Sequence, residues 1–209
     1  MRTISFLAAL ALLAVPALAQ ADAASQPATD PQVTRLLEAK KTLKWNYAPA
    51  GKAERYGHAE ALVAAPADAV AKAAVDFGHY RELHKKFSTA RVVGKEGDMT
   101  DVYMRYPVSI GPMRIEFYEV MRFGKISSNG SMHVLEGRGV KGDMKQGHTV
   151  ITVKPVDATH SLLSVDILLV PAMPAPQSLI DEELRDGAQD FVNGLKDRSQ
   201  GWVGPVTSL

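Results

Sequence analysis

Apolar and polar residues alternate along six short segments between residues 89 and 169, and turns rich in Gly, Asp and Asn separate these segments. A period of two predicts strands with one buried face, and the close spacing of the turns is typical of an antiparallel meander. The six predicted strands are Thr89 to Lys95, Asp101 to Val108, Arg114 to Phe123, Met132 to Arg138, His148 to Lys154, and Leu162 to Leu169.

The segment from Pro176 to Arg198 has a different period. Apolar side chains recur at spacings of three and four, which predicts an amphipathic helix with one buried face. Gly187 and Gly194 lie beside the apolar stripe, where the lack of a side chain leaves room for a neighbouring backbone or a ligand. The stripe consists of Ile180, Leu184, Ala188, Phe191 and Leu195. This order of elements predicts a sheet that wraps around a closing helix.

One more strand and two short helices precede the meander. The strand is predicted from Tyr56 to Ala65, the first helix from Asp68 as N-cap to Asp76, and the second from about Tyr80 to Lys85. Both helices are too short to be stable alone, so we expect them to pack on the rest of the domain. Upstream of this unit, Pro31 is predicted to open an additional helix that runs through Lys44.

The first 19 residues have the features of a signal peptide. Arg2 precedes an apolar run from Ile4 to Val15, and the A-x-A-like pattern at residues 17–19 predicts cleavage before Gln20. An uncleaved anchor is the alternative, but about 12 apolar residues are too few to span a bilayer. The expected product is periplasmic or secreted. The predicted organisation is a signal peptide at 1–19, a disordered lead at 20–30, an N-terminal helical extension at 31–55, the main domain at 56–199 and a tail at 200–209.

Composition limits the classes of partner. The chain has 24 Lys and Arg against 23 Asp and Glu, a net charge of +1, and removal of Arg2 with the signal peptide brings this to zero. Such a balance gives no overall attraction to nucleic acid. The chain has no Cys, so its core must be stable without disulfides, which a domain of this size can achieve.

No motif in the chain indicates a metal, a cofactor or an activated nucleophile. The six His residues show no H-x-H or H-x-x-x-H spacing, and neither a G-x-S-x-G elbow nor a phosphate-binding G-x-x-x-x-G-K-[ST] loop occurs. We therefore predict no cofactor. Acid–base catalysis by Glu119, Tyr106 or a His remains open, because it needs only one or two such groups.

Strand, two short helices, six strands and a closing helix is an order similar to that of the START-like, Bet v 1-like and polyketide-cyclase (SRPBCC) superfamily. The resemblance spans Tyr56 to Arg198. Its best local piece is DVYMRYPVSIGPMR, which ends at Arg114 and resembles a START-type pattern in which a strand ends near a Pro and an Arg opens the next strand. Ile115 stands where that pattern usually has Asp. A second similar piece, VDFGHY from Val75, lies at the junction of the two short helices.

The resemblance implies an α+β helix-grip fold, with a curved antiparallel sheet of about seven strands around the long C-terminal helix. It also implies an apolar cavity between sheet and helix that holds a lipid, sterol, quinone or aromatic molecule. Combined with the alternation along the strands, it gives a set of candidate ligand-binding residues: Met104, Tyr106, Arg114, Phe117, Glu119, Met121, Glu136, Val165, Ile167, Leu184 and Phe191.

Four of these candidates are polar or charged, and besides Glu136 each of them has two interpretations. Glu119 either faces the cavity, with Glu136 or Arg138 as its partner, or points to water because a β-bulge shifts the register. Arg114 either binds a ligand carboxylate or phosphate at the cavity mouth or is an ordinary surface charge. Tyr106 either hydrogen-bonds a ligand hydroxyl or is a half-buried core residue.

Three functions follow as hypotheses. The first is an exported protein that carries or presents a hydrophobic ligand. The second is a cyclase- or hydrolase-like enzyme that acts on an apolar substrate in the same cavity. The third is an interaction module with a solid core, which contacts another envelope protein through the helix at 31–44 or through Trp202 in the tail.

Overall fold

The structure is a computed structural model that describes residues 30–110 and 112–200. The predicted signal peptide, almost all of the disordered lead and the tail with Trp202 lie outside the described residues.

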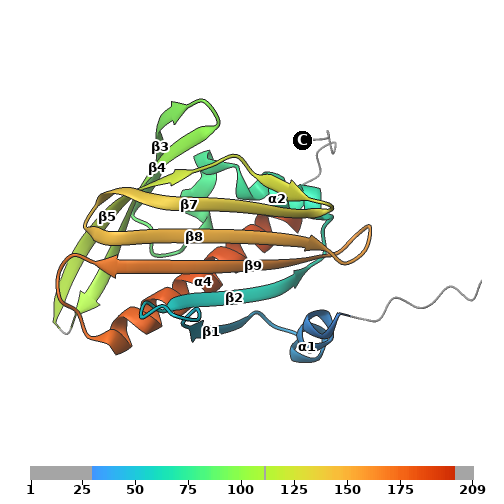
Figure 1. Ribbon diagram of the computed structural model, residues 1–209, viewed down its shortest axis with the longest axis horizontal. Coiled ribbons are helices and arrows are strands. Elements are labelled where there is room, and N and C mark those ends of the chain that lie inside the picture. The colour runs from blue at the N-terminus through green and yellow to red at the C-terminus, as the bar shows by residue number, and fades with distance from the viewer. Residues whose placement is uncertain (1–29, 111, 201–209) are drawn as a thin grey trace, which may run out of the picture.

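A single antiparallel sheet forms most of the domain (Figure 1). Its spatial order is β1-β2-β9-β8-β7-β5-β4-β3, and the short β6 pairs with β7. The sheet is curved and unclosed, with β1 and β3 at its two edges. The strands are β1 (Leu43–Tyr47), β2 (Tyr56–Val63), β3 (Thr89–Glu96), β4 (Met99–Ile110), β5 (Met113–Phe123), β6 (Ser127–Asn129), β7 (Met132–Gly142), β8 (Met144–Pro155) and β9 (Ser161–Pro171).

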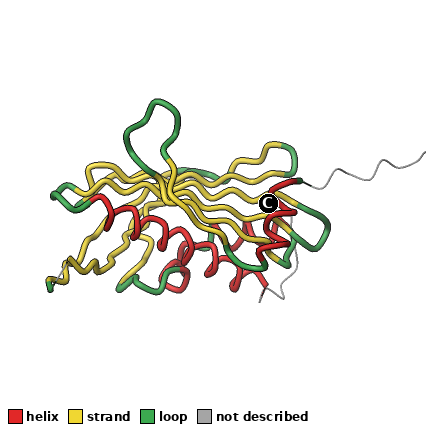
Figure 2. Tube along the Cα trace, turned by 90° about the horizontal axis from the view of Figure 1, so that it is seen from below, coloured by secondary structure: helices red, strands yellow, loops and turns green. Residues whose placement is uncertain are grey.

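The long helix α4 (Gln177–Gln200) lies on the concave face of this sheet, where it contacts β2 and β9 (Figure 2). Helix α2 (Ala67–Ala74), the 3-10 turn η1 (Phe77–His79) and helix α3 (Tyr80–Leu83) connect β2 to β3, and α2 and α3 pack against α4. The predicted α+β helix-grip fold is confirmed. The described sheet has nine strands rather than about seven, because β1 and β6 were not anticipated.

The predicted helix through Lys44 is wrong in its second half. Helix α1 (Pro31–Ala39) ends where Lys40 adopts a left-handed conformation, with a φ of 53°. Leu43–Tyr47 then forms the edge strand β1, in which Trp45 pairs with His58 of β2. The open edge of β2 and the strand-favouring aromatic residues outweigh helical propensity in this segment. Trp45 therefore belongs to the sheet.

Two glycines allow α4 to approach its neighbours closely. A Cβ atom on Gly57 of β2 would lie 2.2 Å from the backbone of Leu184, and one on Gly194 would lie 2.4 Å from the carbonyl oxygen of Leu83. Both contacts are too short for any side chain. These contacts hold both halves of α4 close to the rest of the core, which also contains a cluster of aromatic side chains that includes Tyr80 and Phe123.

Candidate ligand-binding cavity

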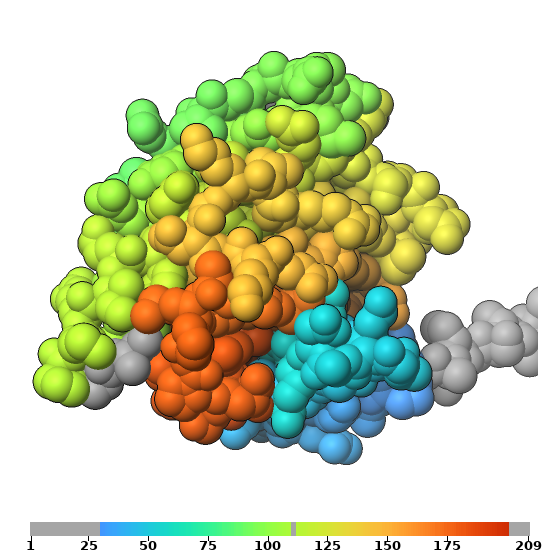
Figure 3. Space-filling view, turned by 60° about the vertical axis from the view of Figure 1, so that its left-hand side comes forward, coloured from blue at the N-terminus to red at the C-terminus, as the bar shows by residue number. Residues whose placement is uncertain are grey.

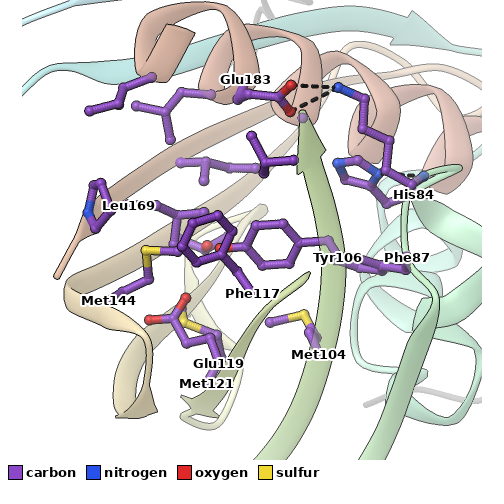
Figure 4. Close-up of a pocket in the computed structure, with 18 of the residues that line it drawn as sticks. His84, Phe87, Met104, Tyr106, Phe117, Glu119, Met121, Met144, Leu169 and Glu183 are labelled. Atoms are coloured by element: carbon purple, nitrogen blue, oxygen red, sulfur yellow. Dashed lines mark hydrogen bonds and ion pairs between the residues drawn. The ribbon is translucent and has the colours of Figure 1, made fainter. Parts of the chain in front are cut away.

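A cavity of about 110 Å³ lies between the concave face of the sheet and α4 (Figure 4). Strands β4, β5, β8 and β9 supply one wall, α4 supplies the opposite wall, and the segment between α3 and β3 closes one side. Most of the lining is apolar and comes from Phe87, Met104, Val108, Phe117, Met121, Phe123, Met144, Ile167, Leu169, Leu179, Ile180, Leu184 and Phe191.

The structure brings eight of the eleven candidate residues together around this cavity. Their side chains either point to the inward face of a strand or lie on the apolar stripe of α4. Side chains from four separate elements therefore line the cavity. These residues are Met104, Tyr106, Phe117, Glu119, Met121, Ile167, Leu184 and Phe191. Their contact with a ligand stays a prediction.

The other three candidates lie elsewhere. Arg114 is exposed at the start of β5, and Val165 is fully buried in the core without lining the cavity. Glu136 is exposed, and its Oε1 accepts hydrogen bonds from His148 Nε2 at 2.7 Å and from Arg138. On β7 the neighbouring residue Leu135 points into the core, so Glu136 must point outward. The prediction that Glu136 or Arg138 partners Glu119 is wrong.

Glu119 faces the cavity and is only 2% exposed. The sheet does contain a bulge beside it, but the extra residue is Val140 of β7, so the alternation along β5 is intact. The reading in which a bulge turns Glu119 to water is therefore wrong. Its carboxyl group occupies space left by two glycines: a Cβ on Gly139 would lie 2.2 Å from Oε1, and one on Gly147 would lie 1.9 Å away.

The Glu119 carboxyl group accepts no hydrogen bond and forms no ion pair within residues 30–110 and 112–200. Burial disfavours the ionised form and raises the pKa of Glu119 to about 8. This carboxyl group is accordingly protonated in most molecules at neutral pH.

Tyr106 is the second polar group in the cavity wall. It lies on β4 opposite Phe117, and since Met104 is opposite Glu119, Tyr106 and Glu119 are diagonal neighbours on the same face. The buried hydroxyl group of Tyr106 has no hydrogen-bond partner among the described residues. Burial and the nearby charge of Glu119 raise the pKa of this phenol well above its ordinary value.

His84 also lines the cavity, and sequence reasoning did not select it. Its Nδ1 accepts a hydrogen bond from the backbone N–H of Lys86 at 3.1 Å, which assigns the proton to Nε2. Burial outweighs the attraction of Asp190 and lowers the pKa of His84 to about 4, so the ring is neutral at physiological pH. Its ring stacks on Phe87 at 4.7 Å. No spacing pattern in the sequence marks this residue.

An ion pair joins two sides of the cavity. Lys86 Nζ donates to both carboxylate oxygens of Glu183, at 2.9 and 2.8 Å, and so links the α3–β3 segment to α4 (Figure 4). Figure 3 shows the end of the molecule where the β4–β5 hairpin lies next to the segment between β9 and α4. Two exposed methionines, Met113 and Met173, belong to these two segments.

Two other features are absent from residues 30–110 and 112–200. No three His, Asp or Glu side chains are grouped so that they could hold a metal ion. No helix there is sufficiently long and apolar to cross a bilayer.

Comparison with known proteins identifies the fold. No protein family and no curated protein sequence matches the chain. Among solved structures, a STAR-related lipid transfer protein from Xanthomonas axonopodis is similar with a TM-score of 0.63 and 14% identity, over 77% of this chain and 94% of that one. Human STARD10 is similar with a TM-score of 0.60 and 8% identity, over 83% and 80%. A START superfamily protein from Mycobacterium smegmatis has a TM-score of 0.56 and 13% identity, over 69% and 97%.

These likenesses confirm that the chain has the START-like helix-grip fold, as the order of its elements predicted. At identities this low they establish the fold alone.

Proposed function

We propose that this protein binds a hydrophobic small molecule in the cavity between its sheet and α4, and carries or presents that molecule. The observation that carries the proposal is the cavity itself, because most of its lining is apolar although it lies within an otherwise packed core. Burial of apolar ligand surface contributes roughly 25 cal/mol per Å², so such a site gains affinity without many polar contacts. Two of the similar structures belong to proteins named for lipid transfer or for the START superfamily, which supports the proposal.

A cavity-blocking variant tests this proposal. Leu169 lines the cavity and is half-buried, so Leu169→Trp should place an indole ring in the space that a ligand needs. Leu37 is 58% exposed on α1, away from the cavity, and Leu37→Trp is the matched control. A fluorescent apolar probe is titrated into each protein after circular dichroism has established that both fold. We expect Leu169→Trp to weaken probe binding at least tenfold and Leu37→Trp to leave it unchanged. Equal binding by all three proteins would reject the cavity as the site.

We further propose that the protein acts after export. The proposal rests on the signal-peptide pattern at residues 1–19, and a carrier in an aqueous compartment would shield its ligand from water. If the protein presents its ligand to an envelope protein, that step would also take place after export. Cell fractionation with N-terminal sequencing tests the export step. The expected N-terminus is Gln20 in the exported fraction, and an intact Met1 in the cytoplasm would refute it.

One observation favours the second candidate function, a cyclase- or hydrolase-like enzyme. Glu119 is a buried acid with its pKa raised to about 8 inside a cavity, and such groups can serve as general acids near neutral pH. The two functions differ in what happens to the ligand. An enzyme would convert the molecule that co-purifies with it, and Glu119→Gln would abolish that conversion, whereas a carrier returns its ligand chemically unchanged. Mass spectrometry of the ligand before and after incubation decides between them.

The third hypothesis, an interaction module with a solid core, required a filled space between sheet and helix. Because a cavity lies between sheet and helix, this space is not filled and the third hypothesis loses its support.

A further inference from the structure

Two polar groups in the cavity have no partner in the protein. The Glu119 carboxyl group borders the cavity and has no hydrogen bond to any described residue, and the Tyr106 hydroxyl is buried and unpaired. Buried polar groups are almost always hydrogen-bonded, since an unpaired one has lost its water without replacement. Both groups lie on the same face of adjacent strands, so one ligand atom can reach between them.

The remaining charged and titratable groups of the lining do not compensate these two. His84 is neutral, and Lys86 is held by Glu183. The described lining therefore offers no free cation to an anionic headgroup, and it places an acid in the interior. A carboxylate or phosphate at this position would have to lose its water without gaining a counter-charge.

The backbone of the sheet leaves the space that the Glu119 carboxyl group occupies. Gly139 and Gly147 lie directly under Glu119, and any side chain at either position would displace the carboxyl oxygen. The bulge at Val140 falls in the same part of β7. Several backbone features therefore combine to hold an acid at a place where packing alone would favour an apolar residue.

We infer that the cavity selects a neutral amphiphile with a hydroxyl head, which donates its proton to Glu119 and accepts the Tyr106 O–H. This inference rests on the proposed function. A hydroxyl group is both donor and acceptor, so a single oxygen atom satisfies both protein groups. A protonated amine cannot accept from Tyr106, an ether cannot donate to Glu119, and a carboxylate has no proton to donate and finds no free cation in the described lining.

The position of the pair along the strands also gives the orientation of the ligand. Glu119 is six residues from Met113 at the hairpin end of β5, a separation of about 20 Å along a strand. A head that reaches Glu119 and Tyr106 therefore lies deep in the domain. The apolar body of the ligand then extends past Phe117 toward Leu169 and Met144, which line the cavity on the way to the hairpin end.

A series of ten-carbon ligands tests the inference. Decan-1-ol, decyl methyl ether, decylamine and decanoate compete at pH 7 with the bound apolar probe on the full mature chain. We expect the alcohol to bind about fivefold more tightly than the ether, as one additional hydrogen bond implies. The carboxylate should bind at least tenfold more weakly than the alcohol, with the amine between them.

Two variants give a signature that a merely structural role would not produce. Glu119→Met should weaken the alcohol about fivefold more than the ether, because only the alcohol donates a proton to the Glu119 carboxyl group. Tyr106→Phe should weaken both, because both accept from Tyr106. Glu116→Met and Tyr118→Phe are the matched controls: Glu116 is exposed on the same strand, Tyr118 does not line the cavity, and neither change should alter the order of the ligands.

Each outcome decides the inference. If the four ligands bind alike, or if neither variant changes the ratio of alcohol to ether, recognition of a hydroxyl head is refuted while hydrophobic binding stands. If decanoate binds most tightly, the inference is refuted. If neither the probe nor any of the four ligands binds, the proposed function fails and the inference fails with it.

Discussion

The ionisation of Glu119 should make the protein less stable as pH rises. The pKa of this carboxyl group is about 8 in the folded protein against 4.5 for an unperturbed Glu. Below about pH 4.5 both the folded and the unfolded chain hold the proton. Between pH 4.5 and 8 only the folded chain holds it, so each increase in pH favours unfolding. Above about pH 8 both states are ionised and the loss of stability levels off.

The size of the effect follows from the two pKa values. Between pH 5 and pH 9 the free energy of unfolding should fall by roughly 4 kcal/mol on account of this one group. Water that enters the cavity beside the ionised carboxylate would reduce this figure. Even half of it is a large share of the roughly 5–15 kcal/mol that stabilises an ordinary domain.

Urea denaturation at a series of pH values measures this effect if the wild-type chain is compared with Glu119→Gln, which has nearly the same shape and no titrating proton. We expect the difference in free energy of unfolding between the two proteins to grow by about 4 kcal/mol, in favour of the variant, from pH 5 to pH 9. Glu116→Gln, at an exposed position of the same strand, controls for the loss of one carboxylate. A difference that stays constant across this range would show that Glu119 titrates normally and is not a buried, unpaired acid.

Three further predictions concern the framework around the cavity. Tyr80 is fully buried and donates a hydrogen bond of 2.6 Å to a backbone carbonyl of α2, so Tyr80→Phe should lower the free energy of unfolding by about 1–2 kcal/mol in urea denaturation. Gly57→Ala should cost about 3 kcal/mol in the same assay because its Cβ would overlap the backbone of Leu184, whereas Gly94→Ala, with an ordinary 3.5 Å contact, should cost much less. Lys86→Met removes the exposed ion pair with α4, so it should change stability by less than about 1 kcal/mol. The same variant should speed release of the apolar probe in stopped-flow measurements, and an unchanged rate would show that this ion pair does not restrain the cavity.

The sequence predicted those parts of the fold and the cavity that depend on local periodicity. The alternation along β5 is regular, so Phe117 and Met121 were correctly expected on one face, and the same reasoning held for Met104 and Tyr106 on β4. Glu119 follows the same alternation, although the sequence left open whether it faces the cavity or water. The spacing along α4 likewise predicted its buried stripe, including Leu184 and Phe191.

The features that the sequence did not predict depend on distant parts of the chain. Strand β1 forms because the edge of β2 is available, and a local pattern cannot show this. On β7 the odd-numbered and the even-numbered positions each include polar and apolar residues, so the sequence does not show which face of the sheet Glu136 is on. The structure decides this, because the neighbouring residue Leu135 lies in the core. His84 becomes a cavity residue only because α4 packs beside it with a glycine at position 187, where a Cβ would lie 3.3 Å from Nε2.

Native mass spectrometry of the protein purified from its own host is the decisive test of ligand binding. We expect one apolar molecule bound per chain, released by organic solvent, with a neutral hydroxyl head when its structure is determined, and absent from the Leu169→Trp variant. A wild-type chain that carries no such molecule, and that also fails to take up an apolar probe, would contradict the claim that the cavity is a ligand-binding site.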